Sequence, residues 1–150
     1  MISYNTEEIS FNLSQKRLVS KWLKTIANNN GYQLGDLNYI FCSDEYLLEI
    51  NKQYLGHNYY TDIITFDYSE DYKEISKDSK IYGDIYISID TIKHNASEYG
   101  EGFDRELHRV IAHGLLHLIG FDDVTESLQV EMHRQEDIAL DILQSLRNEI

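Results

Sequence analysis

The sequence predicts an α+β domain, with a small mixed sheet of about four strands carrying helices on one side. Segments with strand character come early in the chain and the longest helical patterns come late, with one alternation of strand and helix near the start. The 150 residues contain no proline, no linker and no low-complexity run. Residues 1–150 are therefore expected to form one compact domain with its own core.

The first half of the chain is expected to supply two strands and two helices. Alternating polar and apolar residues predict an outer strand, and apolar residues at helical spacing follow it. A second apolar, β-branched and aromatic run then precedes a short helix that ends at Gly56. The predicted elements are a strand within residues 4–13, a helix capped by Ser14 and running through Ile26, a strand at 37–42, and a helix capped by Asp44 and running through Tyr54.

The second half is expected to supply the other two strands and the three remaining helices. Residues 61–67 are β-branched and aromatic enough for a strand buried on both faces, and the charged segment 69–80 predicts a loop or hairpin excursion. The predicted elements after it are a strand at 81–88, a helix from the cap Asp90 to about Tyr99, a helix capped by Asp104, and an amphipathic helix at about 126–147.

Composition limits the classes of function. The formal net charge is −13, so the average field repels RNA, DNA and anionic membranes, and a nucleic-acid role requires a local site or a partner protein. The N-terminus has no signal-peptide pattern and no apolar stretch approaches about 18 residues, which predicts a soluble cytosolic protein. The single cysteine, Cys42, excludes an internal disulfide and is expected to be a small buried strand residue.

The strongest chemical signal is the segment 110–123, VIAHGLLHLIGFDD. His113 and His117 are four residues apart in an apolar helical run, so both imidazoles leave one face of the helix. Gly120 is expected to end this helix, and the turn that follows brings an acidic side chain near the pair. Two imidazoles, a carboxylate and room for water make an open tetrahedral site of the hydrolytic kind. The helix is expected to be the central, most buried one.

Other readings of this segment remain open. Histidine pairs at this spacing also occur by chance on half-buried helices. Zinc peptidases with this helical geometry carry a glutamate directly after the first histidine, where this chain has Gly114, so a peptidase is disfavoured. His108 lies about 140° around the helix from His113 and is expected to be partly exposed, and His133 is also expected outside the ligand face.

Three motifs resemble those of the YbeY family of metal-dependent endoribonucleases of bacterial ribosomal RNA maturation. Residues 113–123, HGLLHLIGFDD, resemble the family signature His-Gly-x-Leu-His-Leu-x-Gly-Tyr-Asp-His. Residues 61–66, TDIITF, look like its Thr-Asn/Asp-Val-Leu-Ser-Phe strand, and residues 83–88, GDIYIS, look like its Gly-Asp-Ile-x-Ile-Ser strand. The motifs occur in the family's order and cover most of the chain from about Asn51 onward.

The chain departs from the family at two important positions. Asp123 stands where the third ligand is usually histidine, which lowers the site charge by one and admits harder divalent ions more easily. Leu55 stands where the family carries an arginine thought to hold phosphate, and leucine provides no bidentate clamp. We expect a nearby cation, Lys52 or by preference His57, to replace it. A proline that normally follows the Ser-Phe pair is Asp67 here.

The resemblance implies a single-strand-specific endoribonuclease of 16S rRNA 3′-end maturation and ribosome quality control. Its implied metal ligands and catalytic residues are His113, His117 and Asp123, its cofactor is Zn²⁺ or another divalent transition metal, and its partners are ribosomal RNA and the small subunit with its proteins. Asp122 and Asp84 are the candidates for orienting the water or a ligand histidine. The alternative from another class is a ribosome-associated binding factor with a structural metal and no cleavage activity. Neither DNA nor a membrane is expected as a partner.

Overall fold

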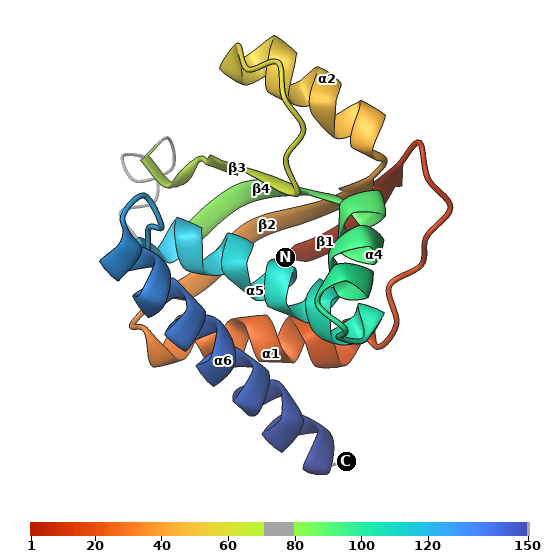
Figure 1. Ribbon diagram of the computed structural model, residues 1–150. Coiled ribbons are helices and arrows are strands. Elements are labelled where there is room, and N and C mark those ends of the chain that lie inside the picture. The colour runs from red at the N-terminus through yellow and green to blue at the C-terminus, as the bar shows by residue number, and fades with distance from the viewer. Residues whose placement is uncertain (71–79, 150) are drawn as a thin grey trace.

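The computed structural model describes residues 1–70 and 80–149, and it has a four-stranded sheet with helices packed against it (Figure 1). The predicted excursion at 69–80 lies mostly on residues outside this description. The described elements in chain order are β1 (Ile2–Glu7), α1 (Lys16–Asn29), β2 (Gln33–Cys42), α2 (Asp44–Leu55), β3 (Ile63–Asp67), β4 (Lys80–Ser88), α4 (Ile89–Glu98), α5 (Phe103–Ile119) and α6 (Glu126–Asn148).

The sheet is mixed, as the sequence predicts. Its strand order is β1-β2-β4-β3. The pairs β1/β2 and β2/β4 are parallel, with α1 in the first connection and α2 in the second, and the pair β3/β4 is antiparallel. The α+β class is therefore confirmed.

Helices lie on both faces of the sheet, so the expectation of helices on one side was wrong. Helices α1, α5 and α6 lie on one face, whereas α2 lies beyond the opposite face (Figure 1). The physical reason is a second apolar cluster, in which Cys42 and Ile64 from the sheet pack against Leu47 and Ile50 of α2. Helix α2 removes these side chains from water at one end of an otherwise more polar face.

Strand β3 corrects a second expectation, because it is not buried on both faces. Among the strands of residues 1–70 and 80–149 it pairs with β4 alone, at the edge of the sheet, and among its five residues Ile64 alone is buried. Its β-branched residues still divide between the two faces, with Ile63 packed on the main core and Ile64 on the α2 cluster. Composition therefore identified the strand but not its place in the sheet.

The N-terminal strand and the helix caps also differ from prediction. The strand ends at Glu7, and Ile9, Phe11 and Leu13 pack on the main core from the connection that follows. The predicted caps Ser14, Asp44, Asp90 and Asp104 each lie within one or two residues of the observed cap. The observed N-caps are Gln15, Ser43, Ser88 and Gly102, of which the two serines accept hydrogen bonds from the backbone N–H three residues later.

Helix α5 is the central helix, and its close approach to the sheet depends on two glycines. A Cβ on Gly114 would lie 2.8 Å from Cγ2 of Ile85, and one on Gly83 would lie 2.8 Å from Cδ1 of Leu118. The Tyr39 hydroxyl also donates a 2.8 Å hydrogen bond to the Ile111 carbonyl. These contacts fix how high the helix lies above the sheet, and they explain why glycine follows His113.

The buried side chains Cys42 and Trp22 both belong to the core. Cys42 is fully buried, as predicted, and so is Trp22, whose Nε1 donates a hydrogen bond to the Ala139 carbonyl. Burial raises the pKa of the Cys42 thiol to about 12, so it stays in the unreactive thiol form. Across 1–70 and 80–149, every helix is too short or too polar to cross a lipid bilayer.

His108 was expected to be partly exposed, and this was wrong. The residue is 8% exposed and its ring lies edge-on to Trp22, with 5.8 Å between ring centroids. Helices α1 and α6 both pack against α5, so more than one face of α5 is covered and the helical period alone could not identify an exposed side. Burial lowers the pKa of His108, and the nearby positive charge of Arg147 lowers it further.

The folded protein therefore favours the neutral His108 ring, and its stability should depend on pH. The unfolded chain binds a proton on His108 more readily than the folded protein does. The stabilisation that comes from the neutral ring is therefore complete above about pH 6.5 and declines as the pH falls through that value. The decline stops below the lowered pKa of His108 in the folded state. We expect the free energy of unfolding in urea to fall less between pH 7.5 and 5.5 in His108→Phe than in wild type. Exposed His94, as His94→Gln, is the control, and identical pH slopes for wild type and His108→Phe would contradict this.

Candidate metal centre

The two histidines project from the last two turns of α5, on its open side. Their side chains are 18% and 28% exposed, and the ring centroids of His113 and His117 lie 5.0 Å apart. The opposite side of the helix carries Ile111, Leu115 and Leu118 into the core. Apolar packing thus leaves both imidazoles at the same edge, as the four-residue spacing predicts.

The turn after α5 brings in the acidic side chain. Gly120 has φ 126°, and its N–H and that of Phe121 donate to carbonyls of the last helical turn. Asp122 accepts a 2.8 Å hydrogen bond from the Asp123 N–H, and Gln129 of α6 donates to the Asp123 carbonyl. These bonds hold the reversed chain in place, so the Asp123 carboxylate lies beside the histidines.

The three side chains have the spacing of ligands around one ion. Asp123 Oδ2 lies 3.6 Å from His113 Nε2, and Oδ1 lies 3.4 Å from His117 Nε2. One ligand atom from each residue falls within 4.8 Å of the others. Two ligands about 2.1 Å from an ion at the tetrahedral angle are about 3.4 Å apart. The donor set of two imidazoles and a carboxylate therefore fits a divalent metal ion.

A buried glutamate of α6 fixes the first histidine. Glu136, whose side chain is 3% exposed, accepts a 2.7 Å hydrogen bond from His113 Nδ1. This bond assigns the proton to Nδ1 and leaves Nε2 free to face the site. Glu136 also accepts a bond from Arg109 at 3.2 Å and lies 3.2 Å from His133 Nδ1. The carboxylate is thus satisfied on both oxygens.

The electrostatics of this cluster favour a cation at His113. Burial alone would lower the pKa of His113, but the hydrogen bond and charge of Glu136 raise it above its ordinary value. Burial alone would raise the pKa of Glu136, but bonds with His113, His133 and Arg109 hold it below its ordinary value. Glu136 therefore remains ionised, and its negative charge stabilises positive charge on the imidazole it contacts.

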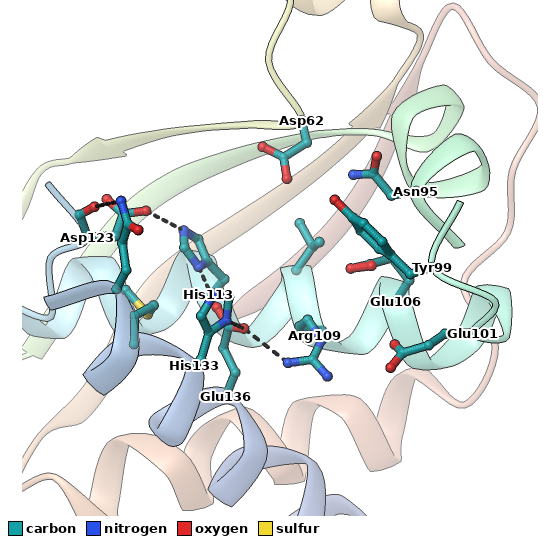
Figure 2. Close-up of a pocket in the computed structure, with 13 residues that line it drawn as sticks. Asp62, Asn95, Tyr99, Glu101, Glu106, Arg109, His113, Asp123, His133 and Glu136 are labelled. Carbon is teal, nitrogen blue, oxygen red and sulfur yellow. Dashed lines mark hydrogen bonds and ion pairs between the residues drawn. The ribbon is translucent and has the colours of Figure 1, made fainter. Parts of the chain in front are cut away.

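A pocket of about 540 Å³ opens beside the ligands. Figure 2 shows His113 and Asp123 at one side of it and Tyr99 and Glu101 at the other, with Asp62 above. The lining is strongly acidic, and burial raises the pKa of the Asp62 carboxyl. The pocket is large enough for one nucleotide-sized ligand next to His113 and Asp123.

The other candidate residues lie elsewhere. Lys52 is on α2 and pairs with Glu49 at 3.5 Å, and the His57 ring stacks on Tyr59 in the connection to β3. Leu55 is 44% exposed at the end of α2. None of these three residues, all within the described ranges, lines the pocket. A phosphate-binding role for Lys52 or His57 stays a prediction.

In the described part of the chain neither Asp122 nor Asp84 bonds to His113 or His117, and a role of either in orienting a water stays a prediction. Asp122 caps the turn, as described above, and Asp84 bonds to Asn38 and Tyr68 on the outer face of the sheet. Glu136 has the orienting position instead, and sequence reasoning missed it. A signal was present, because Glu136 falls in register with Met132, Ala139 and Leu143 on the buried stripe of α6. A carboxylate in such a stripe needs buried partners.

Comparison with known proteins gives a consistent result. The family model described as "Endoribonuclease YbeY" matches residues 1–144. Proteins named "Endoribonuclease YbeY" from Cytophaga hutchinsonii and Parabacteroides distasonis are 48% and 46% identical over 141 and 142 residues, covering 94% and 95% of this chain and the same shares of their own lengths. A solution structure from Thermotoga maritima shares the fold, with a TM-score of 0.66 at 24% identity over 99% of this chain and 93% of that one.

The family's signature residues occupy the places described above. The helix with its histidine pair, the glycine turn and the following aspartate all fall within the matched region, and the strand motifs form β3 and β4 of the sheet. On the sequence match and on these relatives, the chain belongs to the YbeY endoribonuclease family.

Proposed function

We propose that the protein is a metal-dependent, single-strand-specific endoribonuclease that matures the 3′ end of 16S rRNA and acts in ribosome quality control. The observation that carries this proposal is the convergence of His113, His117 and Asp123 at distances of 3.4 to 3.6 Å beside an open pocket. Membership of an endoribonuclease family supplies the substrate class. We assign these three residues as metal ligands and as the catalytic centre.

The chain's own residues would perform distinct tasks around the ion. What a divalent ion supplies at such a site is Lewis acidity toward a phosphodiester and a water of lowered pKa. His113, His117 and Asp123 would hold it, and Glu136 would keep His113 in the tautomer whose Nε2 faces the site. The pocket beside them would orient one nucleotide of the substrate.

We propose Zn²⁺ as the cofactor. Two imidazoles, one carboxylate and an open fourth position are the ligand set of catalytic zinc sites. Asp123 in place of a third imidazole adds a negative charge and a hard oxygen donor, so Mn²⁺ or another divalent transition metal is the competing occupant.

We propose the cytoplasm as the site of action and the small ribosomal subunit, with its RNA and proteins, as the partner. The net charge of −13 opposes long-range attraction of RNA. Docking on a ribosomal protein would bring the RNA to the pocket without a basic surface on this chain. Neither DNA nor a membrane is proposed as a partner.

The test combines metal analysis with defined substrates. Elemental analysis of purified protein should find about one divalent ion per chain. The metal-loaded protein should cleave a single-stranded RNA containing the 3′ end of precursor 16S rRNA and leave the same sequence intact in a duplex. In a depletion strain, 3′-extended 16S rRNA should accumulate. Equal cleavage of both substrates, or normal 16S ends after depletion, would contradict the proposal.

A binding factor with a structural metal is the second candidate, and the acidic lining of the pocket favours it. Asp62, Glu101 and Glu106 all face the space that a phosphodiester would enter. Removal of the metal distinguishes the two functions. A structural ion contributes folding free energy, so its loss would unfold the protein, whereas removal of a catalytic ion should leave the circular dichroism spectrum unchanged.

A further inference from the structure

The part of the pocket farthest from the ligands has side chains that the metal site does not use. Asn95 and Tyr99 from α4 and its end and Glu106 from α5 point into one recess, and Asp62, the residue before β3, lies above it (Figure 2). Tyr99 is 68% exposed, so one face of its ring is available to a ligand. The recess therefore combines an aromatic surface with amide and carboxylate groups.

Glu106 is the most unusual of these residues. It is 5% exposed, yet its carboxylate has no hydrogen bond or ion pair with any residue in the described ranges. Burial raises its pKa despite the positive charge of Arg109 nearby. Among the described residues no side-chain oxygen is both inaccessible and without a partner, so the Glu106 carboxylate is open to solvent in the recess. Because it faces the recess, a ligand there can supply the missing donors.

A second small metal ion does not fit this recess. Within residues 1–70 and 80–149, the histidine, cysteine and acidic side chains close enough to share one ion are His113, His117 and Asp123, and no such group includes Asp62 or Glu106. The carboxylate acceptors of the recess instead favour a ligand that carries hydrogen-bond donors. An aromatic wall beside them favours a flat ring over a flexible amine.

Among the four RNA bases, guanine has the matching edge. Its N1–H and exocyclic N2 amino group present two neighbouring donors that one carboxylate can accept together, while O6 accepts from a side-chain amide such as that of Asn95. Adenine and cytosine present an amino group beside an acceptor, and uracil presents one N–H between two carbonyls. Unpaired bases in single-stranded RNA are commonly bound by stacking on an aromatic ring and by hydrogen bonds to this edge.

We propose that the recess binds the base of a nucleotide next to the cleaved phosphodiester, that guanine is preferred, and that Glu106 determines this preference. This proposal rests on the endoribonuclease function above and adds a base specificity to it. Tyr99 stacks on the base, and Glu106 accepts from its N1–H and amino group. Glu106 is a specificity-determining residue and has no part in binding the metal.

The test compares cleavage of oligouridine RNAs that contain one internal guanine, inosine, adenine or cytosine. Inosine lacks only the exocyclic amino group. With metal-loaded, full-length wild type, kcat/KM should be about 10- to 100-fold higher for the guanine substrate than for adenine or cytosine, with inosine between. In Glu106→Gln the new amide N–H₂ opposes the guanine donors, so this preference should disappear.

Asp104→Asn is the matched control, because it removes one negative charge from the same turn of α5 at an exposed position. It should keep the wild-type preference. Thermal unfolding verifies that Glu106→Gln is folded, and wild-type binding of guanosine 5′-monophosphate against inosine 5′-monophosphate by calorimetry gives a second measurement that needs no variant.

The outcomes separate this proposal from the proposed function. Cleavage without base preference, or with a preference that Glu106→Gln leaves intact, overturns the role of the recess and leaves the nuclease function standing. Absence of any RNA cleavage overturns the nuclease function. If no RNA is cleaved, equal binding of the two monophosphates also overturns the proposed guanine preference of the recess. Tighter binding of guanosine 5′-monophosphate than of inosine 5′-monophosphate supports that preference.

Discussion

Replacing His117 with alanine is expected to abolish metal binding and reduce RNA cleavage by at least about 100-fold. Loss of a hydrogen-bonded neighbour of a ligand already costs about 10- to 100-fold in metal affinity or activity, and loss of a ligand should cost more. His117 lies at the open edge of α5, with a side chain that is 28% exposed. Its removal therefore leaves the core packing of the helix unchanged.

The measurement is elemental analysis of the purified variant together with its rate on single-stranded RNA. His94→Ala is the control, because it removes a histidine from an exposed position on α4. The circular dichroism spectrum of both variants should match that of wild type. A His117→Ala protein that retains one ion per chain and cleaves RNA at the wild-type rate would disprove the assignment of the metal centre.

Replacing Glu136 with alanine is expected to weaken metal binding by about 10- to 100-fold and to destabilise the metal-free protein by about 2 to 3 kcal/mol. The first effect follows because His113 loses the acceptor that fixes its tautomer. The second follows because Arg109, with a side chain 20% exposed, loses its buried partner at 3.2 Å. Both effects come from one carboxylate, which would act on metal binding through its hydrogen bond with His113.

Asp137 provides a matched control for this variant. It also pairs with Arg109, at 3.4 Å, but its side chain is 63% exposed, so Asp137→Asn should change stability by no more than about 0.5 kcal/mol and metal affinity not at all. Glu136→Gln keeps one oxygen acceptor and should recover part of the metal affinity. Urea unfolding of metal-free protein and metal titration provide the data. If Glu136→Ala and Asp137→Asn lower stability and metal affinity equally, the loss of a negative charge near Arg109 explains the result, and the contact of Glu136 with His113 has no role.

The convergence of His113, His117 and Asp123 was predictable because its geometry is local. The histidine pair depends on the helical period, and Asp123 depends on a glycine turn three residues long, so both follow from neighbouring residues. Glu136 lies 23 residues from His113, and its place opposite the histidine depends on how α6 packs on α5. A single acidic residue in an amphipathic helix gives no indication of its partner.

The errors in the fold have the same cause. The β-branched content of β3 identified a strand, but its edge position depends on the strand order. His108 has the spacing of a surface residue with respect to His113, yet α1 and α6 together cover it. At the starts of α2 and α4 the predicted cap was displaced by one or two residues because serine and aspartate are adjacent or nearly so there, and both residue types cap helices well.

The alternation of β4 links the pairing of the strands to the metal centre. Gly83 and Ile85 face α5, and Asp84 faces the opposite side, where it bonds to Asn38 of β2. If β4 slipped by one residue against β2, Asp84 would enter the core and the space beneath Leu118 would close. Helix α5 would then be lifted, and its histidines would separate from Asp123. The metal content of a preparation should consequently report the fraction of chains that folded with the correct strand register.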